Sequence, residues 1–128
     1  MLFMSPEHVA AMNDLLDHSA EVRTACSVLR QPRVLAYELS NGPDGRTVHW
    51  TVTFDRTVHF SLEPSEQPDV LMRGDWAQMI RATTAGRRGE SADPGVSVSG
   101  DVQVLEEVGP VLELGRSVAT LDVEFPEV

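Results

Sequence analysis

A short apolar segment that runs into Gly-Asp and then into an apolar-periodic segment occurs twice in this sequence. The first copy spans residues 68–80 and the second spans residues 95–105. We interpret each copy as a strand end, a conformationally permissive glycine, and an aspartate that accepts hydrogen bonds from the free N–H groups of the next helix. Asp75 and Gln78 also have the spacing of a capping box. The repeat therefore predicts two strands that lead directly into helices.

The N-terminal part of the chain predicts two further helices. Ser5-Pro6-Glu7 combines a capping hydroxyl, a proline suited to the first turn, and an acid near the positive end of the helix dipole. Apolar residues then recur at helical spacing, at Val9, Met12, Leu15 and Leu16. Asp17-His18-Ser19 is expected to interrupt this helix, and Ser19 to cap a second helix that ends before Pro32.

Three strands are predicted next, over residues 34–39, 47–54 and 57–63, because apolar and polar residues alternate along each segment. The connection at residues 55–57 sets their register. A two-residue turn would place Val52 opposite His59 and mix the two faces, whereas a three-residue connection keeps the apolar residues together. The longer turn gives the pairs Phe54 with Val58, Val52 with Phe60, and Trp50 with Leu62. It also leaves His49 and His59 on the outer face.

The rest of the chain predicts shorter elements. Residues 83–94 contain Gly86, Gly89 and Asp93-Pro94 and are expected to form the most flexible internal segment. Gly109-Pro110 is expected to break the helix after Asp101, with a short helix then reaching Gly115. Residues 118–125 are expected to form a closing strand. Together these elements predict an α+β fold in one domain over residues 1–128, with a mainly antiparallel five-stranded sheet whose helices cover one face.

Composition and charge exclude several functions. The chain carries a net charge of −10, and all ten basic residues are arginine, so we expect no nucleic acid partner. No segment approaches the roughly 20 apolar residues that span a bilayer, and no signal peptide is recognisable, so we expect no stable membrane insertion and a cytoplasmic location. Cys26 is the only cysteine and is expected to be a buried thiol. No metal site and no cofactor are predicted, because the histidines lack ligand spacing.

The order of these motifs resembles the sterol carrier protein type-two family, particularly its small stand-alone bacterial members. The similarity rests on the Ser-Pro-Glu-His-Val-Ala-Ala-Met-Asn opener before three strands, then Pro68-Asp69-Val70, an aromatic-bearing helix, and Val-x-Val-x-Gly-Asp at residues 96–101. It covers essentially the whole chain. The resemblance implies an α+β fold that holds sterols, fatty acyl chains or other apolar molecules between sheet and helices, without catalytic residues.

The sequence departs from that family in two places. Relatives often carry an alanine-rich helical stretch before the second Gly-Asp unit, whereas residues 87–94 here are short and polar. We therefore expect one wall of the family's cavity to be missing. The segment 118–125 also looks more strand-like than the helical tail of the animal carriers.

The candidate ligand-binding residues lie on the apolar face of the predicted sheet and on the helix after Asp75. A small-molecule pocket is mostly apolar with few polar groups, and tryptophan and methionine suit its walls. The predicted set is Trp50, Val52, Phe54, Phe60, Leu62, Trp76, Met79 and Ile80. Any one of these residues could equally fill an ordinary dry core. We expect Trp50 and Trp76 to face the same interior and to be among the least exposed large side chains.

Three functions fit these observations. The leading hypothesis is non-enzymatic binding or carriage of a small apolar or amphipathic ligand. The alternative is a pocket-shaped enzyme, similar to a cyclase or isomerase, that acts on an apolar biosynthetic intermediate, with Tyr37, Asp75 and His49 as candidate polar groups. A third hypothesis is an interaction module in which an exposed sheet edge joins two subunits into a homodimer.

Overall fold

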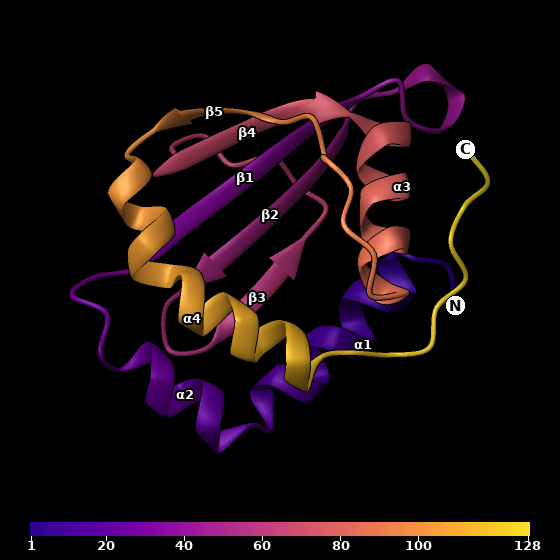
Figure 1. The fold of residues 1–128 in the computed structure, drawn as a ribbon. Helices are drawn as coiled ribbons and strands as arrows, with labels where there is room; N and C mark the ends of the chain where they lie inside the picture. Colours follow the sequence, from indigo (N-terminus) through magenta and orange to yellow (C-terminus); the bar gives the residue numbers. More distant parts are fainter.

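The computed structural model describes residues 1–128 and contains a five-stranded mixed sheet with helices on one face (Figure 1). The sheet order is β3-β2-β1-β4-β5, and only β1 and β4 pair in parallel. The strands are β1 (Arg33–Ser40), β2 (Val48–Phe54), β3 (Val58–Ser61), β4 (Val70–Asp75) and β5 (Ser97–Gly100). A short 3-10 turn, Pro43–Gly45, joins β1 to β2. The predicted α+β fold with a mainly antiparallel sheet is confirmed.

The register between β2 and β3 follows the apolar alternation. Phe54 lies opposite Val58 and Val52 lies opposite Phe60, as the three-residue connection predicts. Leu62 lies beyond the last paired residue, Ser61, so the expected Trp50–Leu62 pair is not part of the ladder. Apolar residues lie opposite apolar residues on neighbouring strands, so their side chains share one face of the sheet. This apolar face is the one that the helices cover.

The connection from β3 to β4 crosses the opposite face of the sheet. Residues 62–69 pass behind the strands in Figure 1 and bring β4 alongside β1. Thr51 Oγ1 donates to the Glu63 carbonyl at 2.6 Å, and the Asp69 N–H donates to the Val34 carbonyl at 2.9 Å. Because this connection lies on the opposite face, it leaves the apolar face free for the helices.

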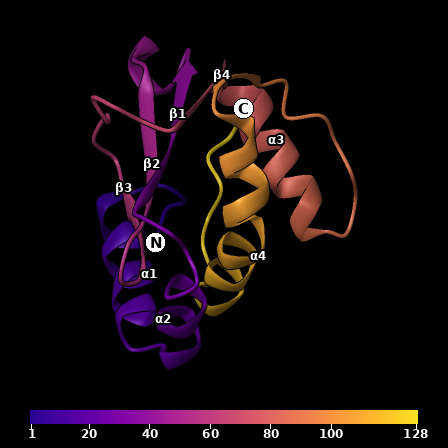
Figure 2. The ribbon, with the colours of Figure 1, turned by 90° about the vertical axis from the view of Figure 1, so that its left-hand side faces the viewer.

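The two N-terminal helices begin where the capping residues predict. Helix α1 spans Pro6–Asp17 and helix α2 spans Ala20–Cys26. Ser5 Oγ accepts from the His8 N–H at 3.1 Å, and Ser19 Oγ accepts from the Val22 N–H at 3.2 Å. Seen along the edge of the sheet, α1 runs beside β3 while α3 and α4 stand over the apolar face (Figure 2).

The two Gly-Asp units form the predicted strand-to-helix junctions. Asp75 caps α3 (Trp76–Arg87) by accepting from the Gln78 N–H, and Asp101 caps α4 (Val102–Val118) by accepting from the Gln103 N–H. Gly100 adopts φ +101°, which favours glycine. Glycine at position 74 instead avoids a close contact, because a Cβ atom there would lie 3.0 Å from Val96 Cγ1. The capping box is half formed, because the Gln78 side chain donates to the Asp93 carbonyl instead.

Two expectations about the C-terminal part are wrong. Helix α4 continues through Pro110 to Val118, although an interior proline costs about 3 kcal/mol relative to alanine. Its apolar face is buried on both sides of the proline, at Val104, Val108 and Val111, and this burial outweighs the lost backbone hydrogen bond. The segment 118–125 is not a strand of the sheet. Its ladder contact is a single parallel bridge between Leu2 and Glu124.

The expected irregular segment over residues 83–94 is shorter than predicted. Helix α3 extends to Arg87, so Thr83 to Arg87 are helical, and the irregular connection begins only at Arg88. The Thr83 and Thr84 hydroxyls donate to the Met79 and Ile80 carbonyls, which satisfies these polar side chains inside the helix.

The apolar face of the sheet is covered by two separate clusters. The larger one joins α1, α2 and α4 to the strands, and the smaller one consists of Met4, Leu39, Trp76 and Ile80. Tyr37 and Trp50 are only half-buried and pack against both clusters. Trp76, 7% exposed, is buried as expected. The same expectation is wrong for Trp50, although both indoles do contact the smaller cluster.

None of the helices combines the length and hydropathy that crossing a bilayer requires.

One edge of the sheet is closed by a side chain instead of a strand. Asn13 on α1 accepts from the Phe60 N–H at 2.8 Å and donates to the Phe60 carbonyl at 2.9 Å. This amide reproduces the two hydrogen bonds that a neighbouring strand would make with β3. It thereby protects an edge that would otherwise be open to pairing.

Replacing Asn13 with Ala should lower the free energy of unfolding by about 1–3 kcal/mol, because both Phe60 backbone groups would lose their partners. Asp14→Ala is the matched control, since that side chain is exposed on the same helix and should change stability by less than about 0.5 kcal/mol. Urea unfolding followed by circular dichroism measures both variants. Equal stabilities for the two variants would contradict the assigned role of Asn13.

Candidate functional site

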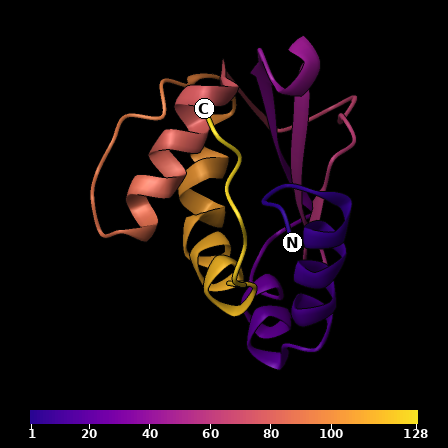
Figure 3. The ribbon, with the colours of Figure 1, turned by 90° about the vertical axis from the view of Figure 1, so that its right-hand side faces the viewer.

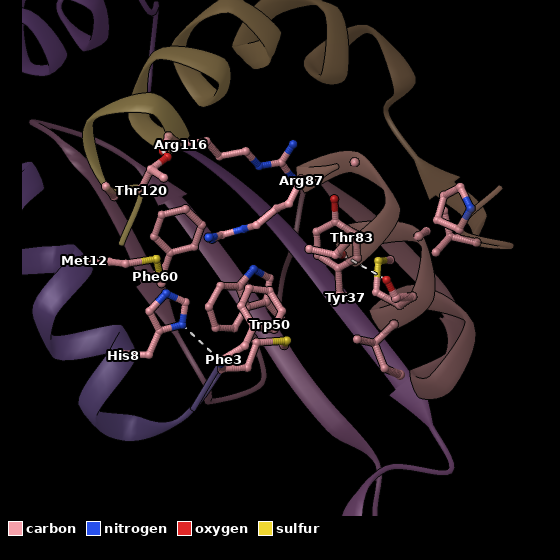
Figure 4. A pocket seen from close by; sticks show the side chains of 18 of the residues that line it. Phe3, His8, Met12, Tyr37, Trp50, Phe60, Thr83, Arg87, Arg116 and Thr120 are labelled. Carbon is pink, nitrogen blue, oxygen red and sulfur yellow. Dashed lines mark hydrogen bonds between the residues drawn. The ribbon is translucent and has the colours of Figure 1, made fainter. Parts of the chain in front are cut away.

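A hollow of about 780 Å³ lies between the apolar face of the sheet and the helices. Its 20 lining residues come from α1, β1, β2, β3, α3 and α4, from the connection after α3, and from the chain termini. Twelve of them are hydrophobic, so its wall is chiefly apolar. Figure 4 shows the side chains converging from the sheet and from the helices on opposite sides. The hollow lies over Tyr37 and Trp50, where the two apolar clusters meet.

Aromatic rings form one wall of the hollow. Trp50 and Phe60 lie with ring centroids 5.2 Å apart, and Phe3 lies 6.3 Å from Trp50. The Phe3 ring is also 5.3 Å from that of His8. These rings are held on β2, β3 and the N-terminal segment, so their positions depend on the sheet register and on how that segment is anchored.

The two ends of the chain anchor each other beside the hollow. The Phe3 N–H donates to the Glu124 carbonyl, and the Glu124 N–H donates to the Met1 carbonyl, each at 2.9 Å. Phe3 and Phe125 have ring centroids 4.9 Å apart. Figure 3 shows the C-terminal segment running from the end of α4 past the N-terminal segment. The tail therefore holds Phe3 against the hollow.

His8 is the most deeply buried polar residue of the wall, at 1% exposure. Its Nδ1 accepts a hydrogen bond from the Met4 N–H at 3.0 Å, so the ring proton of the neutral form lies on Nε2. Nε2 is buried and has no hydrogen-bond partner in the protein. Burial lowers the pKa of His8 below its ordinary value, and the nearby charge of Arg87 lowers it further. His8 is therefore neutral, and its Nε2–H group has no hydrogen-bond acceptor within the protein.

Two arginines supply positive charge to the hollow. Arg87, at the end of α3, and Arg116, on α4, both line it and are exposed at its rim. The guanidinium of Arg87 donates to the Leu121 carbonyl at 3.0 Å and lies 5.2 Å from the centre of the Phe125 ring. Neither arginine forms an ion pair, and the hollow contains one acidic side chain, Glu113. Arg87 thus belongs to the wall of the hollow.

The structure divides the predicted ligand-binding residues into two groups. Trp50, Phe60 and Met79 line the hollow. Val52 and Phe54 are fully buried in the larger cluster, while Trp76 and Ile80 belong to the smaller cluster and Leu62 packs against it. Sequence reasoning missed His8, Met12 and Leu39 in the wall. For His8, the available signal was its helical spacing to Met12, which places both on one face of α1.

No helix follows α3 before β5, so the alanine-rich helical stretch of the relatives has no counterpart over residues 88–96. This side of the hollow is lined instead by Ala82 and Thr83 on α3 and by Ala92 and Pro94 in the irregular connection.

The polar groups considered for catalysis do not meet in one place. Tyr37 lines the hollow, but His49 does not, and Asp75 accepts hydrogen bonds from Asn41 and from the Gln78 N–H as a helix cap. These hydrogen bonds lower the pKa of Asp75, that from the Asn41 side chain most. Cys26 is buried as predicted, and burial raises the pKa of its thiol. No group of three or more His, Cys, Asp or Glu side chains is placed to hold a metal ion.

No protein-family model and no curated protein matches the sequence. Solved structures do match the fold. A crystal structure of sterol carrier protein 2 is 16% identical with a TM-score of 0.58, covering 91% of this chain and 96% of that chain. A conserved hypothetical protein from Thermus thermophilus, described as possibly a sterol carrier protein, is 16% identical with a TM-score of 0.56, covering 93% and 88%. A structure named UbiJ-SCP2 ubiquinone synthesis protein is 23% identical with a TM-score of 0.50, covering 91% and 97%. The chain therefore has the sterol carrier protein 2 fold that the resemblance predicted.

Lowering the pH from about 7.5 to about 5.5 should destabilise the protein through His8, by at most about 1.4 kcal/mol per pH unit. Because its pKa is lowered in the folded state, the unfolded chain binds a proton to His8 first as the pH falls through about 6.5. His8→Asn keeps an acceptor for the Met4 N–H and removes this titration. Urea unfolding of both proteins across the range isolates His8, since all other groups are shared. Parallel pH profiles would contradict a lowered pKa.

Proposed function

We propose that this protein binds a small apolar or amphipathic ligand, of the lipid, fatty acyl or sterol-like kind, in the hollow between sheet and helices, and carries it without catalysis. The observation that carries this proposal is the hollow itself: about 780 Å³, chiefly apolar, at the junction of two clusters that otherwise cover the sheet. That volume falls within the range of about 300–1,000 Å³ typical of small-molecule sites.

The side chains of the wall suit a ligand of this chemistry. Trp50 and Phe60 offer flat apolar surfaces, and Met12 and Met79 can adapt to different shapes through their flexible thioethers. A bound hydrocarbon would remove this surface from water, at roughly 25 cal/mol for each Å² buried. The fold gives further support, because two of the similar structures are named as a sterol carrier protein or as possibly one.

A second candidate function has two observations in its favour. The similar structure named as a ubiquinone synthesis protein, together with the Tyr37 hydroxyl in the wall, fits an enzyme that positions an apolar biosynthetic intermediate. The two functions differ in the fate of the ligand. A carrier returns the same molecule that it took up, whereas a cyclase or isomerase returns a different compound, which chromatography separates from the substrate even where the two have the same mass.

A homodimer through β5 is a separate proposal. Ser97 to Gly100 are all exposed, and the outer edge of β5 has no neighbouring strand. Val98 is 43% exposed on the same strand. Sedimentation velocity should then show a dimer that Val98→Lys dissociates, because a charge on an edge strand disfavours pairing. A monomer at all concentrations would contradict it.

Native mass spectrometry of gently purified protein tests the leading function most simply. We expect a fraction of the protein to carry an apolar molecule that organic extraction removes and identifies. The extracted protein should then take up a fluorescent fatty acid or sterol analogue. Consistent absence of a bound molecule, together with no uptake of either probe, would contradict the proposed function.

Replacing Ala82 with Phe should weaken probe binding by at least about tenfold, because the larger side chain occupies part of the hollow. Ala10→Phe is the matched control, since Ala10 is exposed on α1 and does not line the hollow. Fluorescence titration measures the affinities, and circular dichroism checks that both variants fold. If both variants bind as the unsubstituted protein does, the ligand lies elsewhere.

A further inference from the structure

Nε2 of His8 is the one buried side-chain polar atom of the wall that has no hydrogen-bond partner in the protein. Its ring is fixed, because Nδ1 is engaged by the Met4 N–H and the residue is 1% exposed. Figure 4 shows the other nitrogen directed toward Met12 and Phe60, which line the hollow as well. A buried donor without a hydrogen-bond partner destabilises the folded protein. An acceptor brought by a ligand would remove that destabilisation.

The charges around this donor favour an anion. The whole protein is acidic, with a net charge of −10, yet the hollow contains Arg87 and Arg116 against Glu113 alone. Neither arginine has a carboxylate within ion-pair distance, whereas Arg33, Arg73 and Arg88 each do. Arg87 is close enough to His8 for its charge to act on the imidazole. Both side chains reach over the hollow in Figure 4.

We propose that His8 and Arg87 form a subsite for the anionic end of the ligand, a carboxylate in the simplest case. An oxygen of the ligand accepts a hydrogen bond from the Nε2–H of His8 and faces the Arg87 guanidinium, with Arg116 at the rim of the hollow. The apolar remainder lies against Tyr37, Leu39 and Met79. This inference rests on the proposed function and narrows it to an amphiphile with a negatively charged end.

The test compares ligands that share a chain and differ at its end. Dissociation constants are measured by calorimetry for dodecanoate, dodecyl phosphate and dodecan-1-ol. We expect at least one of the two anions to bind about tenfold tighter than the alcohol, since a hydrogen bond to a charged group is about twice as strong as a neutral one. Which anion binds tighter distinguishes a carboxylate from a phosphate end. Equal affinities for all three would overturn the subsite.

Four variants assign the effect to the named residues. His8→Asn keeps an acceptor for the Met4 N–H but removes the donor, and His8→Gln keeps a donor near the Nε2 position. Arg87→Gln removes the charge, and Arg88→Gln is its matched control, because Arg88 is exposed, lies outside the hollow and pairs with Glu90. His8→Asn and Arg87→Gln should each reduce the preference for the anion to about twofold or less, without weakening the alcohol. Arg88→Gln should leave the preference intact, and His8→Gln should retain part of it.

Alcohol binding separates this proposal from the proposed function. If no ligand binds to the unsubstituted protein, the proposed function fails and the subsite fails with it. If the alcohol and the anions bind alike, the hollow takes apolar ligands but the subsite is wrong. An anion preference that survives both His8→Asn and Arg87→Gln would also overturn the subsite.

Discussion

Burial of one face of the sheet is the interaction on which the rest of this structure depends. Each of the four helices contributes buried side chains to one of the two clusters on that face. The arrangement requires the register at Phe54–Val58 and Val52–Phe60, because a one-residue slip would turn every apolar side chain away from the helices. It also requires the connection over residues 62–69 to cross the opposite face, which leaves the apolar face free.

The helices do not fill this face evenly, and the hollow follows from that. Helices α1, α2 and α4 complete the larger cluster, while α3 completes the smaller one at the other end of the strands. Trp50 and Tyr37 lie between them, half-buried, with the hollow above. The chain termini pair beside it and hold Phe3 in place. The neutral donor His8 and two arginines without ion pairs also line the otherwise apolar hollow, with Glu113 as its one acidic side chain.

Local chemistry in the sequence was enough to predict much of the fold. Ser5, Ser19, Asp75 and Asp101 mark helix starts correctly, because capping depends only on neighbouring residues. Local signals could not predict elements that depend on tertiary packing. Helix α4 continues through Pro110 because the buried face of the helix extends beyond the proline. The helical spacing of His8 to Met12 indicates that both lie on one buried face of α1. The lack of a partner for His8 Nε2 could not be predicted, because it depends on the folded surroundings. Trp50, Phe60 and Met79, which line the hollow, were selected by their apolar pattern, and the same pattern also selected core residues such as Phe54.

The location of the ligand is the central claim, and an isotope-filtered NOE experiment tests it most directly. Dodecanoate labelled with carbon-13 is added to unlabelled protein, and contacts from the acyl chain to protein protons are observed. We expect contacts to the Trp50 indole and the Met79 methyl group, which line the hollow, and none to Val52, which is fully buried in the larger cluster. Contacts confined to exposed apolar residues such as Val28, which is 78% exposed, would show that the hollow is not the binding site.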